Sequence, residues 1–81
     1  MNPLLEKCYI YIDAVKDWEE LNLSGLYRAD VFRSQCHDEL CEAFGLNKDE
    51  TLIHTRNLEK LDYDGKKLYN ALLKMKKLET F

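Results

Sequence analysis

The spacing of apolar residues predicts that the chain begins with a helix. From Leu4 to Trp18, apolar residues recur at intervals of four, three, four and three, which is the spacing of one helix face. Asn2 and Pro3 precede this stripe. They form a typical helix start, because Asn caps free backbone amides and Pro lacks the amide that would go unpaired. The pattern predicts that this helix ends near Leu21.

A second apolar stripe, from Ala29 to Ala43, predicts a second helix over about residues 25–44. Ser24 stands before it as a candidate cap. Gly45 follows it as a candidate stop, because glycine adopts the left-handed conformation at low cost. The second helix therefore has a predicted signal at each end.

The rest of the chain predicts two more helices. Asn47 and Glu50 have the spacing of a capping box, which predicts a third helix starting after Asn47. Residues 62–65 then form a turn in which Asp62 or Asp64 can cap the last helix. This last helix shows an apolar stripe that we expect to pack on the core, with further apolar residues beside it: Leu68, Leu72 and Met75, flanked by Tyr69, Leu73 and Leu78.

Together these patterns predict an all-α fold, with residues 1–81 forming one small compact bundle of three to five helices. An α+β alternative stays open. Short strands near residues 8–12 and 51–55 would suit the aromatic and β-branched residues found there. A domain of 81 residues has little core to stabilise it, so docking on a partner or on another copy is a fair expectation.

Composition and charge reduce the range of functions that the sequence allows. The net charge of −3 argues against general binding to nucleic acid or to membrane surfaces. No apolar run approaches the roughly 18 residues that a membrane span needs. Three cysteines are an odd count and predict no disulfide framework, which suits reduced thiols in the cytoplasm. We therefore expect a cytoplasmic protein without a membrane segment.

One cluster of residues has the chemistry of a metal site. His37 and Cys41 stand four apart, so on a helix both point to the same side and could bind one zinc ion. His54 and Cys8 would complete the four ligands of this alternative, a small zinc-stapled domain. The preferred interpretation treats the cysteines as small buried hydrophobic residues and predicts no metal or cofactor.

No enzyme motif emerges from the sequence. A cysteine–histidine nucleophile needs an oxyanion hole, and no glycine-rich segment stands near any cysteine to supply its backbone donors. We therefore predict no catalytic residue and a function other than catalysis.

Residues 40–46 resemble the first helix and turn of the helix-turn-helix family. Cys41 is the small residue four positions before Gly45, as in that pattern. The resemblance implies a DNA-binding regulator that uses residues 36–60. It departs from the pattern at Leu52 and Ile53, which would face outward where base-reading side chains belong. The DNA-contacting residues of this alternative are Lys48, Thr51, Thr55, Arg56 and Asn57.

The preferred prediction is a non-enzymatic interaction module that docks a helix face on another protein. Inhibitors, adaptors and regulators of this size and composition include those encoded by phages and mobile elements. Tyrosines and tryptophans at the edges of apolar stripes are typical interface anchors. A run of lysines on the last helix suits an acidic partner or a second copy of the chain. The predicted partner-binding residues are Tyr9, Trp18, Tyr27, Lys66, Lys67, Lys74 and Lys77.

Overall fold

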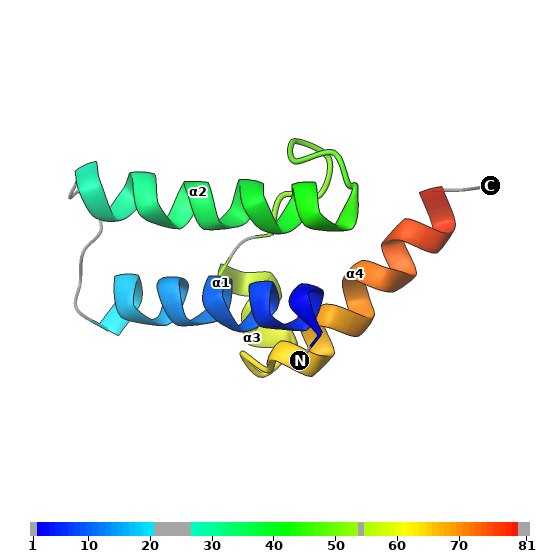
Figure 1. Ribbon diagram of the computed structural model, residues 1–81. Coiled ribbons are helices and arrows are strands. Elements are labelled where there is room, and N and C mark those ends of the chain that lie inside the picture. The colour runs from blue at the N-terminus through cyan, green and yellow to red at the C-terminus, as the bar shows by residue number, and fades with distance from the viewer. Residues whose placement is uncertain (1, 21–26, 54, 80–81) are drawn as a thin grey trace.

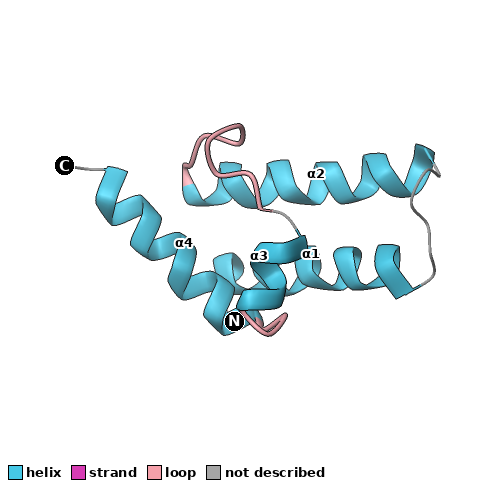
Figure 2. Cartoon of the chain, turned by 180° about the vertical axis from the view of Figure 1, so that it is seen from behind, coloured by secondary structure: helices cyan, strands magenta, loops and turns pink. Residues whose placement is uncertain are grey.

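The computed structural model describes residues 2–20, 27–53 and 55–79, which form four helices and no strand. Figure 2 shows these residues as helices joined by loops. The all-α prediction is therefore confirmed, and residues 8–12, considered as a strand, belong to a helix. The helices are α1 (Pro3–Glu20), α2 (Tyr27–Phe44), α3 (Thr55–Lys60) and α4 (Gly65–Glu79).

The long helices α1 and α2 lie side by side and run in opposite directions (Figure 1). The N-terminal half of α4 packs against α1, and its C-terminal half extends beyond the ends of both long helices (Figure 1). The molecule measures 39 × 25 × 22 Å along its principal axes. The projecting half of α4 has few neighbours, so some of its apolar side chains stay uncovered.

The core lies where α1, α2 and α4 meet. The predicted stripes of the helices supply most of it, since one face of each helix is apolar. Leu46, Ile53 and Leu58 add to the core from the connecting region. The largest side chains with almost no exposure are Tyr11, Leu40, Leu58, Leu68, Leu72 and Val15.

The start of α1 follows its sequence signal. The Leu4 N–H donates to Asn2 Oδ1 at 3.0 Å, so Asn2 is the predicted cap and Pro3 the first helical residue. The helix ends at Glu20, and Leu21, where the end was predicted, lies outside the described residues.

The end of α2 also follows its sequence signal. Gly45 has a φ of 69°, its N–H donates to the Glu42 carbonyl at 3.0 Å, and the Leu46 N–H donates to the Cys41 carbonyl at 2.9 Å. These two bonds define a Schellman motif. The stop predicted at Gly45 is confirmed, whereas the cap predicted at Ser24 lies outside the described residues.

The third helix was predicted to start too early. Asn47 Oδ1 accepts the Asp49 and Glu50 amides at 2.9 and 3.1 Å, but this cap starts only a single turn. The next helix, α3, begins at Thr55. In between, burial alternates with a period of two, because Thr51 and Ile53 are buried and Leu52 is exposed.

A helix does not account for this burial, because residues two apart on a helix point to roughly opposite sides, separated by about 200°. Thr51 and Ile53 are nevertheless both buried. Residues 51–53 form neither the predicted helix nor a strand, and Thr51 lies in a bend.

The turn before α4 places the start of α4 against α1. Asp64 Oδ1 accepts the Lys66 N–H at 2.9 Å, so Asp64 is the cap of α4. Gly65 then lies under the ring of Tyr9, where a Cβ would come within 2.5 Å of a ring carbon. The missing side chain at Gly65 allows α4 to approach α1 this closely.

Candidate interaction surface

Two buried side chains hold the segment 51–53 in place through hydrogen bonds to the backbone of Ile53. The Ile53 N–H donates to His37 Nε2 at 3.2 Å, and the Tyr11 hydroxyl donates to the Ile53 carbonyl at 2.7 Å. The Tyr11 and His37 rings meet edge to face, with 5.7 Å between their centroids. Because Nε2 accepts a hydrogen bond, the neutral ring carries its proton on Nδ1, which lies 3.3 Å from Asp38 Oδ1.

This arrangement gives His37 a structural partner at the nitrogen that a metal would need. Cys41 Sγ lies 3.8 Å from the same Nε2, so the predicted pairing of His37 with Cys41 on one side of α2 is present. The described residues contain no group of three or more potential ligands that could hold a metal ion. Cys8 is buried in the core, and His54 lies outside the described residues.

The three cysteines are buried and unpaired thiols. Burial raises the pKa of the Cys8 thiol to about 12. Burial, and then the charge of a nearby carboxylate, also raise the pKa of Cys36 and of Cys41. A thiol needs a lowered pKa to act as a nucleophile near neutral pH. These thiols therefore have the burial and the raised pKa values of core residues.

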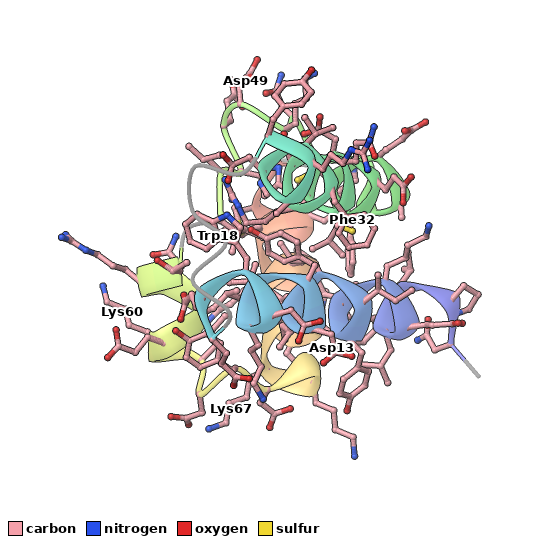
Figure 3. The ribbon with its side chains drawn as sticks, turned by 90° about the vertical axis from the view of Figure 1, so that its left-hand side faces the viewer. Asp13, Trp18, Phe32, Asp49, Lys60 and Lys67 are labelled. Carbon is pink, nitrogen blue, oxygen red and sulfur yellow. The ribbon has the colours of Figure 1, made fainter. Side chains whose placement is uncertain are left out.

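The three aromatic residues predicted to bind a partner lie in different surroundings. Trp18 donates from Nε1 to Asp30 Oδ1 at 2.7 Å and lies on the side of α1 that faces α2 (Figure 3). Tyr9 is 42% exposed and covers Gly65, whereas Tyr27 is 81% exposed at the start of α2. Tyr9 and Trp18 are nine residues apart, which places them on roughly opposite sides of α1. The structure does not bring the three together.

The four predicted lysines are exposed and share one side of α4. Their positions in the helix fall within an arc of about 100°, turned away from the α1 contact. Lys67 forms an ion pair with Asp62. The neighbouring Lys76 instead donates to the Gly45 carbonyl at 2.8 Å. The exposed lysines of this side are Lys66, Lys67, Lys74 and Lys77.

The residues of the DNA-binding alternative do not form a reading helix. In a helix-turn-helix, about three or four residues join the two helices, but here residues 45–54 separate α2 from α3. Thr51 is buried, and Lys48 lies 3.9 Å from the Asp38 carboxylate. The geometry implied by the resemblance is thus absent from residues 36–53 and 55–60. Thr55 is half-buried and Arg56 and Asn57 are exposed, all on α3.

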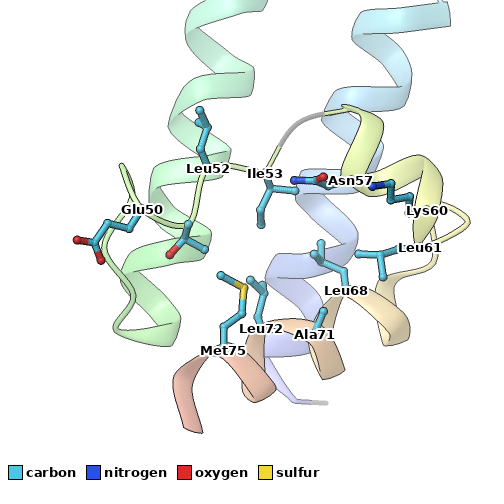
Figure 4. Close-up of a pocket in the computed structure, with 11 residues that line it drawn as sticks. Glu50, Leu52, Ile53, Asn57, Lys60, Leu61, Leu68, Ala71, Leu72 and Met75 are labelled. Carbon is cyan, nitrogen blue, oxygen red and sulfur yellow. The ribbon is translucent and has the colours of Figure 1, made fainter. Parts of the chain in front are cut away.

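An apolar groove runs along α4 and was not predicted. We call it the α4 groove. One part is a hollow of about 380 Å³ between α4, α3 and residues 50–53. The adjoining part, about 340 Å³, continues toward the end of α4 and shares Glu50, Thr51 and Met75 with the first. Figure 4 shows Leu72 and Met75 pointing from α4 toward Ile53.

Three large apolar side chains along the α4 groove are exposed to solvent. Leu52 is 51% exposed, Met75 is 39% exposed and Leu78 is 71% exposed. Met75 belongs to the predicted apolar stripe of α4, but unlike Leu68 and Leu72 it is not buried. A signal was present in the sequence, because the apolar arc of α4 from Leu78 to Leu73 spans about 220°. One packing contact covers a narrower arc than this.

Comparison with protein-family models, with curated proteins and with solved structures finds no match for this chain. Within residues 2–20, 27–53 and 55–79, none of the helices has the length and apolarity that crossing a membrane requires.

Proposed function

We propose that this chain is a non-enzymatic interaction module that docks the α4 side of the molecule on a partner protein. The observation that carries the proposal is the α4 groove, which exposes Leu52, Met75 and Leu78 and lies on a helix whose neighbouring side is rich in lysine. In this role the chain acts as an inhibitor, adaptor or regulator. Its three reduced thiols suit the cytoplasm as the compartment.

Exposed apolar side chains are the energetic basis of the proposal. Fully burying a leucine or methionine side chain contributes roughly 1.5–3 kcal/mol. Three such residues in one groove offer a partner several kcal/mol, whereas a leucine scattered alone on a surface needs no explanation. The lysines beside the groove contribute to partner selection and to the orientation of docking, because both depend on charge complementarity.

The interior supports a function located at the surface. His37 and Tyr11 are engaged with the backbone of Ile53, and the pKa values of the buried thiols are raised. These groups are engaged in holding the fold together. Binding through side chains of α4 therefore explains more of the molecule than chemistry at His37 or the cysteines.

Affinity capture from an extract of the cells that make the protein tests the proposal. The wild-type chain is compared with a Met75→Glu/Leu78→Glu variant and with a Lys16→Glu control on α1. We expect a set of proteins that the wild type and the control retain and the groove variant loses. Identical sets on all three chains would show that the α4 groove does not bind a partner.

A further inference from the structure

We infer that the α4 groove receives an amphipathic helix of the partner protein, with acidic residues on both sides of its apolar stripe. This inference rests on the proposed function and specifies the chemistry of the partner. Its three supports are the shape of the groove, the charges along its borders and the poor fit of the α4 helix of a second copy.

The shape of the groove suits a helix. Its floor is apolar and buried, formed by Ile53, Leu68 and Leu72. From Leu68 to Leu78 it follows eleven residues of α4, a distance of about 15 Å or nearly three helical turns. A helix that lies in such a groove presents apolar residues at spacings of three, four and seven.

Lys60 and Glu50 line the groove directly, and further basic residues stand beside it on α3 and on α4. Lys60 lines the groove from the α3 side, and Arg56 stands beside Lys60 in the next hollow. On the α4 side, Lys74 stands between Ala71 and Leu78 in the helix.

Among the described residues, no ion pair engages Lys60, Arg56 or Lys74. Glu50 is the one acidic residue among those that line the two hollows. Basic groups on both borders therefore complement acidic residues on both flanks of a bound helix.

The α4 helix of a second copy fits this groove less well. If α4 of one copy lay in the groove of another, Lys74 of each would approach the basic border of the other. Like charges brought together in this way disfavour the contact. A nucleic-acid backbone would satisfy Lys60 and Arg56 but would leave the apolar floor uncovered. An acidic amphipathic helix covers the apolar floor and also pairs its acidic residues with the basic borders.

Binding of synthetic helical peptides about 16 residues long tests the inference. One peptide carries leucines at the groove spacing with glutamates on both flanks, and a second replaces the glutamates by lysines. A third keeps the glutamates and replaces the leucines by serines. Fluorescence anisotropy at low salt measures their affinities for the wild type, for Lys60→Glu/Lys74→Glu and for the control Lys16→Glu.

We expect the acidic peptide with leucines to bind the wild type about tenfold more tightly than the basic one, the effect of two or three surface charge pairs. The Lys60→Glu/Lys74→Glu variant should lose or invert this preference, and Lys16→Glu should keep it. The serine peptide should not bind. Circular dichroism checks that the variants keep the wild-type helix content.

Several results would overturn the inference. Equal affinity for the acidic and basic peptides, or no binding of either, would exclude an acidic helix as the occupant. A dimer seen by light scattering and abolished by Leu78→Glu would identify a second copy instead. If capture of partner proteins still depends on Met75 and Leu78 in those cases, the proposed function stands and only the acidic helix is rejected.

Discussion

Two side chains in this protein take the place of backbone partners. Ile53 is buried outside any helix, and the described residues contain no strand that could pair with it. Its N–H and carbonyl are paired instead with His37 and Tyr11. A buried backbone group left without such a partner costs free energy, so these two side chains are what allow Ile53 to stay buried outside a helix.

Removing the Tyr11 hydroxyl should reveal this role. Tyr11→Phe deletes the donor to the Ile53 carbonyl and leaves a buried acceptor unpaired, which we expect to lower the free energy of unfolding by about 1–3 kcal/mol. Urea unfolding measures the loss. The matched control is Tyr27→Phe, which removes the same atom from an exposed residue and should change stability by less than about 0.5 kcal/mol. Equal losses in the two variants would contradict the role of Tyr11.

The buried thiol and phenol predict a loss of stability in alkali. Burial raises the pKa of Cys8 from its ordinary value of 9.0 to about 12, and that of Tyr11 from 10.0 to about 12. Both groups are acids that hold their protons more tightly in the folded state. Their contribution to stability is therefore complete below about pH 9 and is lost as the pH rises toward 12.

Above their ordinary pKa values, each group should lower the free energy of unfolding by up to about 1.4 kcal/mol per pH unit. Urea unfolding between about pH 8 and pH 11 measures this slope. Cys8→Ala removes one of the two titrating groups. In this variant the free energy of unfolding should fall less steeply above about pH 9. Parallel declines in the wild type and in Cys8→Ala would show that Cys8 does not contribute.

Among the helices and turns, local signals predicted the ends well. Asn2 and Asp64 cap helices and Gly45 ends one, because each acts on backbone groups within a few residues of itself. The helix start predicted after Asn47 was wrong for the opposite reason, and α3 begins only at Thr55. Residues 51–53 are held by Tyr11, 42 positions away, and by His37, 16 positions away from Ile53. Neither partner can be inferred from the local pattern.

The contact between α1 and α4 depends on Gly65. Gly65→Ala would place a Cβ within 2.5 Å of the Tyr9 ring, so we expect a loss of about 1–3 kcal/mol as the helices or the ring move apart. A double-mutant cycle with Tyr9→Ala measures the coupling by urea unfolding. With the ring removed, Gly65→Ala should cost less than it does in the wild type. Additive losses would show that the ring does not restrict position 65.

Across the whole molecule, α4 serves two purposes. Its N-terminal half completes the core through Leu68 and Leu72, and its C-terminal half projects with Leu78 exposed (Figure 1). Folding therefore leaves part of the apolar surface of this helix uncovered. The α4 groove results from this division, because its floor belongs to the core and its outer residues do not.

Substitutions along α4 should separate folding from binding. Leu72→Ala removes a fully buried side chain and should lower the free energy of unfolding by about 2–5 kcal/mol. Leu78→Ala shortens the same residue type at an exposed site and should change stability by less than about 0.5 kcal/mol. Thermal or urea unfolding measures both. A large loss for Leu78→Ala would mean that Leu78 packs within the fold and is not held ready for a partner.

The amino-acid sequence alone was enough for the helical class, for three of the four helices and for most of their ends. Apolar periodicity and capping depend on residues only a few positions apart, so these features can be predicted from short stretches of the sequence. The path of residues 51–53, the pairing of Ile53 with His37 and Tyr11, and the α4 groove depend on which distant elements meet. The close approach of α4 to α1 over Gly65 leaves the far half of α4 uncovered. This packing between elements exposes the surface proposed to bind a partner.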